Sequence, residues 1–309
     1  MESFKEKINF IKSSLKERKE FLEDKNIKLT YDEIQLLIYF FDKIELIYKD
    51  IEEEIKREKE LNIKSIGLLD REYPQNLKNI KLPPYMIYVM GNWKEIYKEN
   101  SLGLVGTRYP EDYFAKKIMD EISNELVKNN WNGIGGLAKG CDTYGHEGML
   151  KFGGVTGGIL GNGFGGDIFP EENKELFYRI LDKGGYFLTE LPYGSLTKGC
   201  YLLGRNRLQG TLGKGIFVGE TGIKGGTITT IKSTLAEDKY VFIWNPKNKN
   251  LENFLNVQGN FKIINGEKDM GIGIKDMKKI ISVEDPREIL EIIKKEENKK
   301  LSSSLLTLF

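Results

Sequence analysis

The feature that most constrains the fold of this chain is a regular alternation of short apolar runs with longer amphipathic segments, between residues 86 and 244. Strand–helix alternation of this kind predicts an α/β fold, with a mostly parallel sheet flanked by helices on both faces. The predicted strands are Met86–Val89, Leu102–Val105, Gly133–Gly136, Val155–Leu160, Tyr186–Thr189, Ile216–Val218 and Tyr240–Trp244. The predicted helices lie near residues 111–129, 142–152, 171–183, 200–212 and 226–237.

The first part of the chain is dense in Lys and Glu and repeats its apolar residues at helical spacing. Residues 1–62 are therefore predicted to form a helical N-terminal subdomain, and Thr30 with Glu33 fits the T-x-x-E capping box at a helix start. An apolar stripe opposite a charged face is typical of a helix that covers a core, so no binding role is assigned here.

The α/β core is predicted to cover residues 63–250, and residues 251–309 form a C-terminal extension. Within the extension we predict one strand at Phe261–Ile264 and a last helix over residues 286–297. Leu301–Phe309 is interpreted as a frayed end, in preference to a docking peptide, because chain ends are seldom held in place.

The composition excludes several classes of protein. The formal net charge is only +1, so an anionic partner would need a local basic patch. Cys141, Cys200 and His146 lack the spacing of a metal site, so neither a metal nor a cofactor is expected. The N-terminus has no apolar signal core, and no apolar run reaches the ~18 residues that span a membrane. We therefore expect a cytoplasmic protein with free thiols.

Four glycine-rich turns contain the candidate binding residues. The first, second and fourth each follow a predicted strand, and at the second the chain runs on into a helix, where backbone N–H groups attract anions. The candidates are Gly106, Thr107 and Arg108 in the first turn, Gly136, Lys139 and Gly140 in the second, Arg205, Asn206 and Arg207 in the third, and Gly225, Gly226 and Thr227 in the fourth. Asp142, His146 and Glu220 are candidates for ordering these turns.

The four turns together indicate more than any one of them does. A single glycine between a strand and a helix is often only a tight connection. Because the carboxyl ends of parallel strands meet at one edge of a sheet, we expect all four turns to lie along that edge. Arginine forks and close backbone approach at such an edge suit a chain of phosphates.

A second glycine pattern is interpreted as a turn. Gly161, Gly163 and Gly166 fit G-x-G-x-x-G, but they run into Asp167–Pro170 instead of opening a helix, and no acidic ribose ligand follows. The P-loop motif G-x-x-x-x-G-K-[ST] is absent from the sequence, which disfavours ATP hydrolysis at such a loop.

Taken in order, these motifs resemble the DprA/Smf family over residues 63–246. The family patterns are Y-P-x-x-L, G-[ST]-R, S-G-x-A-x-G-I-D-x-x-A-H, Y-P-x-x-N-x-x-L, S-E-x-P, R-N-R and E-x-x-x-x-S-G-[ST]. The matching residues are Tyr73-Pro74, Gly106-Thr107-Arg108, Gly136–Asp142 with His146, Phe169-Pro170 with Asn173, Thr189-Glu190, Arg205-Asn206-Arg207, and Glu220 with Gly226-Thr227. The sequence departs from the family at Gly135, Cys141, Gly145 and Leu203-Gly204.

The resemblance implies an extended Rossmann fold, binding of single-stranded DNA without sequence preference, protection of that DNA, loading of RecA recombinase, and homodimers. No nucleophile–base pair or metal cluster is visible in the sequence, so no enzymatic activity is expected. It also implies residue roles. Arg108, Lys139, Arg205 and Arg207 would neutralise phosphates, and Thr107 and Thr227 would donate hydroxyl groups. No winged-helix domain is evident after residue 250.

Two alternatives stay open at the level of sequence. A nucleotide-binding sensor, acting for example in phage defence, or a phosphoribohydrolase-like protein would use a related scaffold. The latter needs P-G-G-x-G-T-x-x-E, and Thr230 stands where its glutamate should be. For the arginine pair, an extended turn would let both side chains reach phosphates, whereas a helix would direct one to the edge and the other into the protein. We expect Arg205 to contact phosphate and Arg207 to form an internal salt bridge with Glu220 or Glu190.

Overall fold

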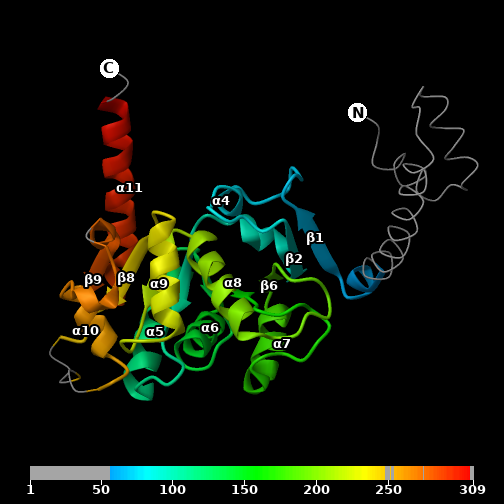
Figure 1. Ribbon diagram of the computed structural model, residues 1–309, viewed down its shortest axis with the longest axis horizontal. Coiled ribbons are helices and arrows are strands. Elements are labelled where there is room, and N and C mark those ends of the chain that lie inside the picture. The colour runs from blue at the N-terminus through cyan, green and yellow to red at the C-terminus, as the bar shows by residue number, and fades with distance from the viewer. Residues whose placement is uncertain (1–55, 248–250, 252–253, 274, 307–309) are drawn as a thin grey trace, which may run out of the picture. The chain divides into compact units, whose positions relative to one another are not determined.

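The computed structural model describes residues 56–247, 251, 254–273 and 275–306, and Figure 1 shows its course. The chain divides into two compact units, Met1–Leu61 and Asn62–Phe309. The predicted N-terminal helical subdomain and its capping box lie outside the described residues, apart from a helical segment at 56–60. The second unit is described below.

Nine strands form one sheet within the described residues, in the order β1-β2-β6-β5-β4-β3-β7-β8-β9. The strands are β1 (Ile63–Gly67), β2 (Met86–Gly91), β3 (Ser101–Val105), β4 (Asn132–Gly135), β5 (Thr156–Ile159), β6 (Tyr186–Thr189), β7 (Gly215–Val218), β8 (Tyr240–Trp244) and β9 (Ile280–Val283). β2 is antiparallel to both of its neighbours, β1 and β6. The strands β6, β5, β4, β3, β7, β8 and β9 are parallel to one another. This is the mostly parallel, Rossmann-like sheet that the sequence predicts.

The helices are α4 (Gln75–Lys78), α5 (Asp112–Lys128), α6 (Cys141–Lys151), α7 (Lys174–Asp182), α8 (Gly199–Thr211), α9 (Gly226–Ala236), α10 (Gln258–Ile264) and α11 (Ile289–Leu306). Helices α5 to α10 connect the parallel strands, α4 lies between β1 and β2, and α11 follows β9. Short 3-10 helices lie at Trp93–Tyr97, Glu171–Asn173, Lys268–Met270, Asp276–Lys279 and Pro286–Glu288. No helix among the described residues is long and apolar enough to span a bilayer.

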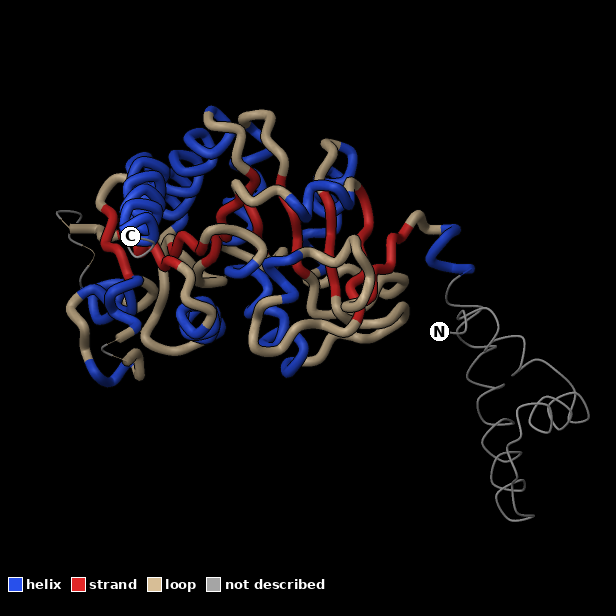
Figure 2. Tube along the Cα trace, turned by 90° about the horizontal axis from the view of Figure 1, so that it is seen from above, coloured by secondary structure: helices blue, strands red, loops and turns tan. Residues whose placement is uncertain are grey.

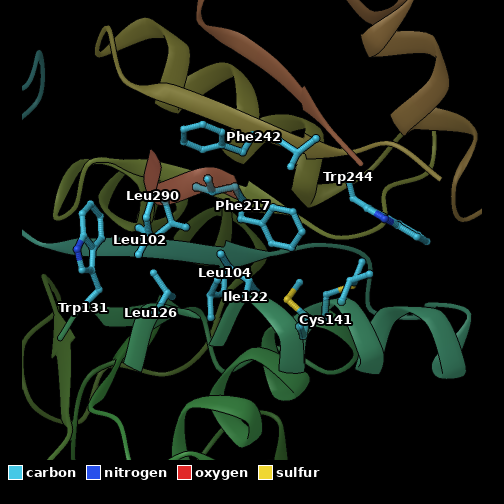
Figure 3. Close-up of a cluster of buried hydrophobic side chains, with 14 of the residues drawn as sticks. Leu102, Leu104, Ile122, Leu126, Trp131, Cys141, Phe217, Phe242, Trp244 and Leu290 are labelled. Carbon is cyan, nitrogen blue, oxygen red and sulfur yellow. The ribbon is translucent and has the colours of Figure 1, made fainter. Parts of the chain in front are cut away.

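Helices cover both faces of the sheet, as Figure 2 shows from above. Along β7 and β8 successive side chains alternate between faces, so Phe217 and Phe242 pack against α5, α6 and α11 while Val218 and Ile243 pack against α9 and α10. Figure 3 shows Phe217 and Phe242 with Leu104 and Ile122 in the first of these clusters. Because both faces of the sheet are buried, side chains on both sides of each strand are apolar, and the strands appear in the sequence as continuous apolar runs.

The strand order places a topological switch point between β3 and β7. From β3 the chain winds outward through β4, β5 and β6, then returns to the other side of β3 as β7. Ligands of open parallel sheets bind outside the carboxyl ends of the strands at such a point. The fold therefore directs attention to the residues after Val105 and Val218.

The structure confirms the seven predicted strands and five predicted helices, and it corrects the C-terminal extension. The strand predicted at Phe261–Ile264 is wrong, because these residues are the last turn of α10, with Ile263 buried against β8 and β9. A four-residue apolar run does not distinguish a strand from a buried helical turn. β1 and β9 were not predicted, and α11 continues to Leu306, where a frayed end was expected from residue 301.

Candidate functional site

Three of the four glycine-rich turns lie side by side at the carboxyl-terminal edge of the sheet. They follow β3, β4 and β7, and β3 pairs with both of the others. The third segment, Gly204–Arg207, was predicted to be a turn but lies inside helix α8. The predicted convergence of the four segments is correct, but one of them reaches the edge from a helix.

Two pockets open along this edge and share Arg108, Tyr109, Ala138, Leu202 and Arg205. The outer pocket has a volume of about 700 Å³ and the switch-point pocket a volume of about 530 Å³. We call the two together the edge groove. Its lining includes the predicted residues Gly106, Thr107, Arg108, Gly136, Lys139, Asp142, Arg205, Asn206, Gly225, Gly226 and Thr227. Gly140, His146, Arg207 and Glu220 line neither pocket.

Arg108 lies where the two pockets meet. Its side chain is exposed and has no hydrogen-bond or ion-pair partner among the described residues. The turn that carries it is fixed by its backbone: Thr107 donates its N–H to the Glu220 carbonyl at 2.7 Å, and its own carbonyl accepts from Cys141 N at 3.1 Å. A free guanidinium on a fixed turn is suited to binding a phosphate.

Gly106 and Gly140 are required by packing between the first turn and α6. A Cβ on Gly106 would lie 2.5 Å from the Cys141 sulfur. Gly140 has φ +74° at the N-cap of α6, and a Cβ there would lie 2.4 Å from the Thr107 carbonyl oxygen. The two glycines therefore hold the Arg108 turn close to α6, which is a structural reason for the motif beside any contact with a ligand.

Arg205 lies beneath the groove and is only 5% exposed. Its Nη1 donates to the Ile159 carbonyl at 2.6 Å, and its guanidinium sits so close to Gly136 that a Cβ there would be 1.7 Å from Nη1. Burial lowers the pKa of Arg205 to about 10, and the charge of buried Asp142 acts in the opposite direction. Arg205 lines both pockets, but most of its surface is used inside the protein.

Asp142 orders the second turn by accepting the Gly136 N–H at 2.7 Å. Burial raises the pKa of this carboxyl group, and the nearby charge of Arg205 partly offsets that rise. The carboxylate thus sits between a backbone donor and a buried guanidinium, as the turn-ordering role predicts.

Arg207 points to the other side of α8 and forms a bidentate salt bridge with Glu190. Nη1 and Nη2 donate to the two carboxylate oxygens at 2.7 and 2.6 Å, and Nε donates to the Leu82 carbonyl at 3.1 Å. The two side chains are 20% and 22% exposed. Of the two partners expected for Arg207, the structure has Glu190.

Arg207→Ala is expected to lower the free energy of unfolding by about 2–3 kcal/mol, since it leaves a mostly buried carboxylate and a carbonyl without donors. Urea unfolding measures the effect. Arg179→Ala is the matched control, because Arg179 makes a similar bidentate pair with Glu147 on an exposed surface, 44% and 37% exposed. The control should cost no more than about 1 kcal/mol, and equal losses in the two variants would contradict the prediction.

Lys139 is not a free cation. Its ammonium group pairs with Glu172 at the rim of the outer pocket, and this pairing lowers the pKa of the Glu172 carboxyl group. Asp167 and Glu171 also line this pocket. The acidic side of the outer pocket therefore attracts phosphate less than the side formed by Arg108 does. The carboxylates there can accept hydrogen bonds from amino groups.

Glu220 and His146 are buried behind the edge groove. Glu220 accepts the Glu111 N–H at 2.7 Å through Oε2, while Oε1 has no partner, and burial raises the pKa of the carboxyl group to about 7. The His146 Nδ1 pairs with the Thr156 hydroxyl at 2.7 Å, and burial lowers the pKa of the ring to about 3. Both side chains support the turns from behind instead of facing a ligand.

Some lining residues were not among the predicted ones. Tyr109 and Phe169, which are 74% and 43% exposed, stand at the outer pocket, while Gln209 and Lys224 line the switch-point pocket. Tyr109 follows Arg108 and Lys224 precedes Gly225 in the sequence, so both could have been predicted from their neighbours. The Gly161–Gly166 segment is a loop that leads into a 3-10 helix, so its interpretation as a turn is confirmed. No cluster of metal-ligating side chains occurs within the described part of the chain.

The fold and the edge groove define a Rossmann-like α/β protein with a groove at the switch point of the sheet. The profile of the family described as DNA recombination-mediator protein A matches residues 64–278. The chain belongs to this family.

Relatives and solved structures agree with this assignment. DNA processing protein DprA of Bacillus subtilis is 29% identical over 201 residues, which are 65% of this chain and 67% of that protein. Protein Smf of Synechocystis is 33% identical over 176 residues, 56% of this chain and 44% of that protein. The crystal structure of DprA from Streptococcus pneumoniae superposes with a TM-score of 0.67 at 21% identity, covering 94% of this chain and 98% of that one.

A second solved structure has the same fold. DNA processing protein A from Helicobacter pylori, described for its single-stranded DNA binding mode, superposes with a TM-score of 0.62 at 19% identity and covers 76% of this chain and 96% of that one. At these identities the two superpositions establish the fold.

Proposed function

We propose that the edge groove binds single-stranded DNA without strong sequence preference. The observation that carries the proposal is the position of Arg108, an exposed guanidinium at the junction of two pockets that has no partner among the described residues. A strand that crosses the junction would place a phosphate on Arg108 and one base in the outer pocket.

The exposed aromatic residues favour a single strand over a duplex. Tyr109 and Phe169 offer ring faces at the outer pocket, and stacking on aromatic rings is how sequence-tolerant proteins hold unpaired bases. The bases of a duplex are already stacked inside the helix and do not reach such rings. The carboxylates of the outer pocket also favour a base over a phosphate there.

Anisotropy of labelled oligo(dT) tests the proposal. We expect binding that weakens as salt rises, because phosphate contacts release counterions, and we expect blunt duplex to be a poor competitor. Equal or tighter binding of the duplex would contradict the proposal. A lack of salt dependence would show that phosphates are not contacted.

Arg108→Ala is expected to weaken binding of single-stranded DNA by about 1–3 kcal/mol, the range of a charge-assisted hydrogen bond. The melting temperature should hardly change, because the side chain has no partner among the described residues. Lys116→Ala, on the exposed side of α5, is the matched loss of one positive charge. Arg108→Ala would be assigned a structural role if it lowered the melting temperature and left the affinity unchanged.

We further propose that the chain protects single-stranded DNA, helps RecA to assemble on it, and acts as a homodimer. The support is membership of a family described as recombination mediators. RecA filament formation on DNA already coated by a single-strand-binding protein tests the second point, and light scattering tests the third. The role is proposed as binding without catalysis, since Thr230 occupies the place of the phosphoribohydrolase glutamate.

A further inference from the structure

The outer pocket of the edge groove presents free carboxylates. Asp167 and Glu171 line it, both side chains are exposed, and neither carboxylate has a hydrogen-bond or ion-pair partner among the described residues. The third acidic side chain of the lining, Glu172, is already paired with Lys139. An ionised carboxyl group accepts hydrogen bonds through two oxygen atoms and donates none. This side of the pocket therefore suits a ligand that carries hydrogen-bond donors.

A buried guanidinium contributes an open donor to the same pocket. Arg205 is 5% exposed and lines the pocket. Its Nη1 donates to the Ile159 carbonyl at 2.6 Å and its Nε to the Leu202 carbonyl at 3.4 Å. Nη2 has no partner among the described residues, and it is not one of the atoms enclosed by protein. A side chain held this firmly with one open donor indicates an acceptor on the ligand.

Asn162 adds an open acceptor. The residue is 7% exposed and lines the pocket, and its Nδ2 donates to the Gly163 carbonyl at 3.1 Å. Its Oδ1 has no partner in the described part of the chain and is likewise not enclosed. The pocket thus has two nearly buried side chains, each with one unused polar atom, besides its exposed carboxylates.

The size and the aromatic rings of the pocket fit one nucleobase. Its volume of about 700 Å³ lies within the range of about 300–1,000 Å³ for sites that enclose one small ligand. Tyr109 and Phe169 offer exposed ring faces for stacking. A planar ligand with both donors and acceptors on its edges meets these conditions.

The four bases differ in how well they match this arrangement. Guanine carries N1–H and the N2 amino group side by side, which together fit the two oxygens of one carboxylate, and its O6 and N7 accept from a guanidinium. Thymine has a single N–H donor, and adenine and cytosine each offer one amino group with no N–H beside it. Guanine is therefore the base that uses most of the open groups.

We propose that the outer pocket prefers guanine, with Asp167 or Glu171 accepting from N1–H and the N2 amino group, and Arg205 Nη2 donating to O6 or N7. The inference rests on the proposed binding of a single strand in the edge groove and adds the identity of one base. The preference acts at one position of the strand, so the phosphate contacts, and with them the binding of other sequences, remain.

Anisotropy with oligo(dT) that carries one central guanine tests the proposal on the full chain. We expect this strand to bind about tenfold more tightly than all-thymine strand, the effect of one good bidentate contact. Hypoxanthine in place of guanine lacks only the N2 amino group and should lose most of the gain. Equal binding of the guanine and thymine strands would overturn the proposal. So would a full gain with hypoxanthine, adenine or cytosine, since stacking alone would then explain it.

Asp167→Asn, Glu171→Gln and the double variant identify the acceptor. An amide has one acceptor oxygen and adds a donor, so the double variant and at least one single variant should reduce the guanine gain to less than about twofold. Their melting temperatures and their affinity for all-thymine strand should hardly fall, because both side chains are exposed. Glu175→Gln removes an exposed carboxylate of α7 outside the pocket lining and is the matched control. A double variant that keeps the full guanine gain would overturn the proposal.

Calorimetry with dGMP and dTMP examines the pocket without a strand. We expect dGMP to bind more tightly than dTMP, and the difference should disappear in the double variant. If oligo(dT) fails to bind while dGMP keeps this advantage, the proposed strand binding is wrong and the guanine pocket stands. If oligo(dT) binds and guanine gains nothing in either format, the strand groove stands and the guanine pocket is wrong. Equal binding of dGMP and dTMP, or binding of neither, would contradict the pocket.

Discussion

Arg205→Ala is expected to lower the free energy of unfolding by about 3–5 kcal/mol, the cost of breaking a buried charge pair by removing one partner. The guanidinium is 5% exposed, and its loss removes the 2.6 Å bond to the Ile159 carbonyl. It also leaves buried Asp142 without its neighbouring positive charge. Urea unfolding, with the midpoint and slope both recorded, measures the loss.

A double-mutant cycle with Asp142→Asn provides the control. If the two charges depend on each other, the double variant should lose less stability than the sum of the two single variants. An Arg205→Ala variant that keeps its stability but loses affinity for single-stranded DNA would show instead that the guanidinium serves mainly as a phosphate contact, as the sequence hypothesis for Arg205 states. The experiment therefore decides between two roles of one buried residue.

Glu220→Gln is expected to stabilise the protein at pH 8 by about 2–3 kcal/mol relative to the unchanged chain. Burial raises the pKa of Glu220 from 4.5 to about 7. Because the folded-state pKa is the higher one, the folded protein binds the extra proton between these values, and stability falls as pH rises from 4.5 to 7. Above pH 7 both states are ionised and the loss is complete.

The cause of the raised pKa is local. Glu220 is fully buried, its Oε1 has no partner within the described part of the chain, and the carboxylates of Glu111 and Asp112 at the start of α5 add repulsion. Burial raises the pKa of Cys141 and Tyr144 of α6, and the nearby charge of Glu220 adds to both rises. The one favourable contact is the Glu111 N–H, which the glutamine oxygen can also accept.

The measurement is the difference in unfolding free energy between Glu220→Gln and the unchanged chain from pH 4 to pH 8. This difference should grow between pH 4.5 and 7 and then level off. Glu147→Gln, which removes an exposed carboxylate paired with Arg179, is the control for the loss of a surface carboxylate. A flat difference for Glu220→Gln would mean that the carboxyl group ionises normally in the fold.

The sequence predicted the α/β class and the edge of the sheet where the candidate residues gather, since both follow from local periodicity. A parallel strand covered on both faces must be apolar throughout, so β3 and β8 could be read directly from their residues. The order of the strands makes their carboxyl ends converge, which brought the first, second and fourth turns together as expected. β1 and the run in α10 carry weaker signals, because four or five residues fit either a strand or a helical turn.

By itself, then, the sequence determined the fold class, the family and most of the residues that line the edge groove. Only the tertiary structure decided what each of them does there. Arg205 and Arg207 are two residues apart in one motif, yet one lies beneath the groove and the other is bound to Glu190, 17 positions away. Lys139 is paired with Glu172, and Arg108 has no partner among the described residues. The reason is physical: the availability of a charge depends on burial and on partners distant in sequence, and local patterns contain neither.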